Sequence, residues 1–113
     1  ISHAGGIFEA RKIAALAETY YAGIAPHCPL GPISLAAGIQ VDAAIPNFVC
    51  QEHVHLGAGY LKQPFAIKDG HVDVPTDPGL GIEVDEEALQ DKLFDGSWPN
   101  PETYHIDGSV ADW

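Results

Sequence analysis

Two side chains could carry out acid–base chemistry together, and each one closes a short apolar run. His27 ends the run AGIAPH, and Glu52 ends the run NFVCQE. Both runs are typical of buried strands, and parallel strands of an α/β barrel bring their carboxyl ends to one rim, where the active site lies. An imidazole can move protons near neutral pH, and a carboxyl group in a partly buried site can stay protonated or donate to a developing anion. We therefore predict a shared site for His27 and Glu52.

A third ionisable side chain, His3, falls near the same rim if residues 1–3 are the end of another strand. A purely structural role for these residues has to be weighed equally at this point. A single histidine or glutamate at a strand end is more often a hydrogen-bonded structural residue than a catalyst. Neither His27 nor Glu52 is therefore assigned to catalysis by its position alone.

Two other patterns carry weaker chemistry. His53 and His55 alternate along the chain and would share one face, a spacing that could bind a metal, but no further histidine or cysteine lies close in sequence. Cys28 directly follows His27, and adjacent side chains of an extended segment diverge, so the two do not form a nucleophile pair.

The elements that position these residues alternate in type. Ala-rich amphipathic periodicity predicts a helix over 7–21, supported by a Glu9–Lys12 pair at helical spacing. The later segments follow in the order strand, loop, helix and strand, over 22–27, 28–32, 33–44 and 47–52. This alternation is typical of a parallel α/β sheet or barrel.

The pattern changes after Glu52. Asp69-Gly70 between alternating runs predicts a hairpin within 65–74. Asp85 is a good N-cap for a helix that would end near Leu93 or Phe94. Residues 82–84 are expected to be extended and 95–113 irregular, with Trp98 and Trp113 as anchors.

Length, composition and charge exclude several classes of protein. The chain of 113 residues allows one small domain, and 46% hydrophobic with 19% charged residues is typical of a globular fold. A net charge of −11 is unsuited to binding nucleic acid or anionic lipid. Two cysteines, no apolar run of membrane-spanning length and no signal peptide predict a cytoplasmic protein.

The first residues suggest that the chain is part of something longer. The sequence opens ISHAGG and contains no methionine, and a strong helix pattern follows at once. We expect the C-terminal piece of a longer protein. The alternative is a free-standing domain that has lost its initiator methionine.

Several strings resemble the enolase superfamily, and within it the mandelate racemase-like branch and its sugar-acid dehydratases of the galactonate dehydratase type. These strings are SHAGGI, APHCPLGPISLAA, QVD, GYLKQPF, KDGHVDVPTDPGLGIEVDEE and DGSVADW. The resemblance implies a modified (β/α)8 barrel of the TIM type with an α+β capping domain. Residues 1–56 would then be the last strands and helices of the barrel, and 57–113 a C-terminal segment that packs with the cap.

The resemblance also implies a reaction. Mg²⁺ binds a sugar acid, a base removes the proton α to the carboxylate, and the 3-hydroxyl leaves the enediolate to give a 2-keto-3-deoxy acid. In this family pattern His27 is the general base, Glu52 stabilises the enediolate, and His3 and Pro29 contact the substrate. The metal ligands, the aspartate that pairs with the histidine and a second acid–base group would lie outside these residues. The segment alone is therefore expected to be inactive.

Other functions remain open. A racemase, epimerase or cycloisomerase of the same superfamily shares the first half-reaction. A non-catalytic partial-barrel module is a further alternative, although open strand edges and apolar helix faces count against it. As partners, the resemblance implies a small-molecule sugar acid, the remainder of the same polypeptide and a homo-oligomer.

Overall fold

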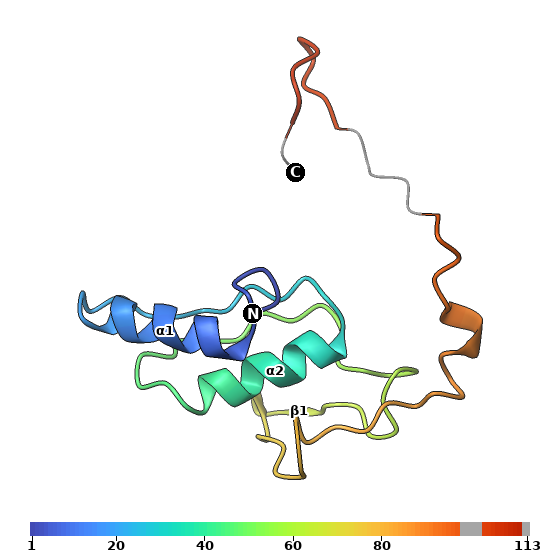
Figure 1. Cartoon of the computed structure of the whole chain (residues 1–113), viewed down its shortest axis with the longest axis horizontal. Helices are drawn as coiled ribbons and strands as arrows, with labels where there is room; N and C mark the ends of the chain where they lie inside the picture. Colours follow the sequence, from blue (N-terminus) through green and yellow to red (C-terminus); the bar gives the residue numbers. More distant parts are fainter. Residues whose placement is uncertain (98–102, 112–113) are drawn as a thin grey trace.

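The computed structural model describes residues 1–97 and 103–111, and its centre is a pair of packed helices (Figure 1). The predicted anchors Trp98 and Trp113 lie outside the described residues. The elements are, in chain order, α1 (Ile7–Glu18), α2 (Pro32–Asp42), β1 (Ile67–Lys68), β2 (His71–Val72) and the 3₁₀ helix η1 (Gln90–Lys92).

Helix α1 is confirmed, but it ends earlier than the periodicity predicts. Its last residue is Glu18, and the chain leaves the helix through a turn in which Tyr21 has a φ of 55°. The expected pair joins Lys12 Nζ to a Glu9 carboxylate oxygen at 2.8 Å. The face that packs inward is made of small residues, the buried Ala10 and Ala14, which allows close approach to α2.

Helix α2 begins at Pro32, where the fixed φ of proline suits the first helical turn. It is apolar around most of its circumference, as expected for a helix covered on more than one side. Val41 and Ile45 pack against the alanines of α1, and Leu35 and Ile39 form a second cluster with Cys28. Both helices thus help to fix the two segments that carry His27 and Glu52.

Those two segments are joined by one parallel β-bridge, Ile24 to Phe48. The Ile24 N–H donates to the Asn47 carbonyl at 2.8 Å, and the Val49 N–H donates to the Ile24 carbonyl at 2.9 Å. The predicted parallel order is therefore present, but the prediction of strands buried on both faces is wrong here. Val49 is 66% exposed, because within the described chain no further strand covers this ladder.

The hairpin is confirmed. Strands β1 and β2 are antiparallel, with Ile67 opposite Val72. Asp69 and Gly70 both have positive φ, 50° and 77°, which is what a two-residue turn of the primed type requires. The Asp69-Gly70 signal is local, which is why the sequence places it correctly.

The helix predicted from Asp85 is wrong beyond its first turn. The Asp85 carboxylate does accept the Ala88 N–H at 3.0 Å, as an N-cap should. The chain then forms turns and the short η1, and Leu93 is extended. A helix this short needs packing to persist, and Leu93 and Phe94 are both about 70% exposed.

The described residues beyond η1 extend away from the two helices (Figure 1). Residues 103–111 contain one bridge, Tyr104 to Val110. In the described part of the chain, no helix is long and apolar enough to cross a membrane.

Candidate active site

His27 and Glu52 lie together, as the strand ends predict. His27 Nδ1 is 2.6 Å from Glu52 Oε2, and both side chains are about half exposed, at 60% and 46%. The same carboxylate oxygen accepts the Cys28 backbone N–H at 2.8 Å. Parallel pairing at Ile24 and Phe48 brings the two segments side by side, and His27 and Glu52 follow a few residues beyond this bridge.

The electrostatics of this pair favour an ionised carboxylate. The hydrogen bond from the Cys28 N–H is the main cause that lowers the pKa of Glu52, and His27 lowers it further, while partial burial acts in the opposite direction. The possibility that Glu52 stays protonated is therefore not supported by this geometry. A carboxylate that only accepts hydrogen bonds requires the proton on His27 Nδ1, which leaves Nε2 as the ring atom able to take a proton.

His3 lies beside the pair, and Pro29 lies beyond it. The rings of His3 and His27 are 6.4 Å apart between centroids and inclined at 49°. Both histidines line a small cavity of about 240 Å³ whose other walls are mainly apolar residues of α1 and the Ile24 segment. Pro29 is exposed in the loop that leads from Cys28 to α2.

The types of the residues did not predict two groups of this site. One is the Cys28 backbone N–H, because a main-chain donor leaves no mark in the sequence. The other is Gln51, whose side-chain Nε2 donates to the Pro26 carbonyl at 3.1 Å and to the Glu52 carbonyl at 2.7 Å. Gln51 and Glu52 are neighbours in an extended segment, so their side chains point to opposite faces. This alternation could have predicted that Gln51 faces the helices.

The described residues include no cluster of three or more histidine, cysteine or acidic side chains able to hold a metal ion. His55, one half of the alternating pair, instead accepts the Gly57 N–H at 2.9 Å and packs edge-on against Tyr60. The side chains around His27 and Glu52 thus do not by themselves form a Mg²⁺ site.

The family model of the enolase C-terminal domain-like family matches residues 1–88, and the chain belongs to that family. It is 48% identical, over its whole length, to the D-galactonate dehydratases of Variovorax paradoxus and Xanthomonas euvesicatoria. The chain spans about a third of the length of these curated relatives, 32% in each case.

Solved structures show the same relationship. A candidate galactarate dehydratase of the enolase type from Agrobacterium radiobacter, bound to sodium and L-malate, is 33% identical with a TM-score of 0.80. The match covers 94% of this chain and 31% of that one. A mandelate racemase/muconate lactonizing enzyme from Sulfitobacter sp. is 44% identical with a TM-score of 0.69, over 77% of this chain and 22% of that one. The fold class is therefore α/β, part of the barrel-type C-terminal domain of this superfamily.

Proposed function

We propose that this chain supplies part of the active site of a sugar-acid dehydratase acting on an aldonate such as galactonate. The proposal rests on one observation above all, the 2.6 Å contact of His27 with Glu52 at two paired strand ends. The similarity to D-galactonate dehydratases over the whole of the chain supports the substrate class.

His27 is the proposed base. Its Nε2 takes the proton from C2 of the sugar acid, and the electron pair of the C2–H bond moves toward the carboxylate to form an enediolate. The pair then returns to form the C2–C3 double bond while the C3–O bond breaks, and the 3-hydroxyl leaves as water with a proton from the second acid–base group, which we place outside these residues. The enol that remains becomes a 2-keto-3-deoxy acid. A positioned general base of this kind contributes about 10²- to 10⁴-fold to the rate.

Glu52 is proposed to act through the same contact. A carboxylate on Nδ1 fixes the ring orientation and stabilises the imidazolium that forms when Nε2 takes the proton. The family pattern instead gives this role to an aspartate outside these residues, and it places the glutamate at the enediolate itself. The two roles differ in one property, because the contact described here needs an ionised carboxylate whereas donation to an enediolate needs a protonated one.

The rest of the site belongs to the proposal as well. Because the described residues do not form a metal site, we propose that Mg²⁺ is bound by other parts of the full-length enzyme. His3 and Pro29 are proposed to contact substrate. We also propose the division into a barrel part, 1–56, and a cap-packing part, 57–113, a homo-oligomer and a cytoplasmic location.

A hybrid enzyme tests the reaction. The third of the Variovorax paradoxus D-galactonate dehydratase that matches this chain would be replaced by these 113 residues. We expect the hybrid to convert D-galactonate to the 2-keto-3-deoxy acid, measured by the release of 2-keto product.

The products distinguish the alternatives. A 2-epimer formed without loss of water would indicate an epimerase. A preference for galactarate over galactonate would replace galactonate as the proposed substrate. A folded hybrid that binds the sugar acid but leaves it unaltered would contradict the proposed dehydration.

A further inference from the structure

The Gln51 side chain joins the two segments that carry the catalytic pair. Its Nε2 donates to the carbonyl of Pro26, one residue before His27, and to the carbonyl of its neighbour Glu52. One amide group therefore bonds to the backbone beside both members of the pair.

This link lies where the backbone pairing ends. The backbone hydrogen bonds between the segments are those of Ile24 with Asn47 and Val49. Further along, within the described chain, hydrogen bonds between the segments involve the side chains of Gln51 and Glu52. The separation of the two strand ends at the level of His27 is thus set by side chains. Of these side chains, Gln51 is the one that lies against Gly38 of α2.

Gly38 of α2 provides the space for this amide. A Cβ added at Gly38 would lie 2.7 Å from Gln51 Oε1 and 3.3 Å from its Cδ. Gly38 is buried, and glycine inside a helix costs roughly 0.5–1 kcal/mol relative to alanine. The helix thus carries a residue that lowers its stability at a position where an added Cβ would displace the Gln51 amide.

We propose that Gln51 is a positioning residue for the proposed dehydration, setting the contact of His27 with Glu52 by tying the two strand ends together, and that Gly38 is glycine in order to leave room for it. This inference rests on the proposed function for its catalytic meaning. The geometry that it describes can be measured without turnover.

The test is an NMR titration of the hybrid enzyme described above, isotope-labelled in its histidine and glutamate side chains. In the unsubstituted hybrid we expect a hydrogen-bonded His27 Nδ1–H resonance and a Glu52 carboxyl that titrates below its ordinary range. Gln51→Met keeps the length of the side chain and removes the donor, so it should raise the Glu52 titration midpoint and lose the Nδ1–H resonance. Gln40→Met is the matched control. The side-chain amide of Gln40, in α2, also donates to two backbone carbonyls, but these belong to Pro75 and Leu80 and not to the segments of the pair.

A second variant separates positioning from general stability. Gly38→Ala should keep or increase the helix content while it displaces the Gln51 amide, and it should raise the Glu52 midpoint in the same direction. If Gln51→Met fails to fold, Gly38→Ala alone decides. The proposal is overturned if a folded Gln51→Met or Gly38→Ala hybrid keeps both the midpoint and the Nδ1–H resonance of the unsubstituted hybrid. Because no activity is measured, this result is independent of whether the hybrid enzyme dehydrates galactonate.

Discussion

At the scale of single residues, the central feature is a carboxylate kept ionised by a backbone N–H and an imidazole. Glu52 accepts from Cys28 and contacts His27 through the same oxygen. An exposed ion pair is worth little by itself, so the importance of this one lies in orientation. The sequence indicated both partners by their types and places, but the backbone donor and the link through Gln51 depend on the register of two segments 25 positions apart. No local pattern encodes that register.

The lowered pKa of Glu52 gives a pH dependence with a definite sign. Its folded-state pKa lies below the ordinary value of 4.5, so the stabilisation is present above that value and is lost as the pH falls through the folded-state pKa. We expect Glu52→Gln to lower the free energy of unfolding at pH 6 and to differ less from wild type at pH 3, measured by urea unfolding. Glu9→Gln, which removes an exposed pair on α1, is the control and should have little effect. An equal difference at both pH values for Glu52→Gln would contradict this account.

The pKa of Asp42, the last residue of α2, is shifted in the opposite direction to that of Glu52. Both carboxylate oxygens are buried without a hydrogen-bond partner in the described structure, and burial raises the pKa to about 7 from 3.8. A carboxylate at a helix C-terminus is also unfavourable to the helix dipole. The folded state therefore holds its proton longer than the unfolded chain, and stability should fall as the pH rises from about 4 to about 7.

Replacing Asp42 tests this directly. Asp42→Asn should raise the free energy of unfolding at pH 8 by about 1–2 kcal/mol, a figure reduced for the partial exposure of the group. It should also remove most of the decline between pH 4 and pH 7 in urea unfolding. If the variant is less stable than wild type at pH 8, Asp42 has a partner that the present account lacks.

At the scale of elements, side-chain bonds to backbone fix how α1 meets the following segment. Asn47 Nδ2 donates to the Ala14 carbonyl at 3.0 Å and to the Ala22 carbonyl at 2.9 Å. Asn47→Ala would remove both bonds and leave the Ala22 carbonyl without this donor, at a cost of roughly 1–3 kcal/mol. Thermal unfolding should show this as a lower midpoint. Asn47→Asp keeps the shape but removes the donor, so it should be destabilising as well, whereas a neutral effect of both variants would contradict the role of Asn47.

The elements also show where sequence reasoning succeeds. Helix α1 and the hairpin are encoded by short-range signals, an alanine-rich period and the Asp69-Gly70 turn, and both are present. The helix expected after Asp85 has its cap but lacks an apolar surface to pack on, so it ends as η1. The two strands are reduced to one bridge, since full strands require neighbours that the described residues do not supply.

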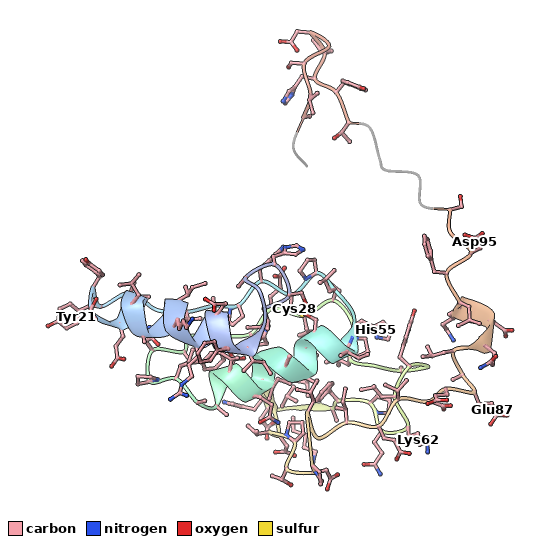
Figure 2. All side chains as sticks on the ribbon, viewed as in Figure 1. Tyr21, Cys28, His55, Lys62, Glu87 and Asp95 are labelled. Atoms are coloured by element: carbon pink, nitrogen blue, oxygen red, sulfur yellow. The ribbon has the colours of Figure 1, made fainter. Side chains whose placement is uncertain are left out.

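At the scale of the whole molecule, the exposed apolar surface is large. Phe8 and Leu16 of α1 are 69% and 64% exposed, and Tyr21 at its far end projects fully into solvent (Figure 2). Surfaces of this kind in folded proteins usually contact another surface. This observation agrees with a chain that spans about a third of its relatives, and it favours a part of a larger fold over a free-standing module.

We therefore expect the isolated chain to have no catalytic activity. With no metal cluster among the residues described, we expect no detectable dehydration of D-galactonate by the 113-residue chain and only weak Mg²⁺ binding, measured by calorimetry. A controlled comparison uses the hybrid enzyme under the same conditions. Turnover by the purified segment alone would show that these residues contain a complete active site.

The role of His27 as the base is best tested by the turnover of the hybrid enzyme with and without the imidazole. His27→Asn should reduce kcat for D-galactonate by about 10²- to 10⁴-fold with little change in folding, because the proton at C2 then has no positioned base. His71→Asn, a change of the same type in the exposed hairpin, should leave kcat within about twofold of the parent hybrid. Full activity in the His27→Asn hybrid would contradict the assignment of His27 as the base.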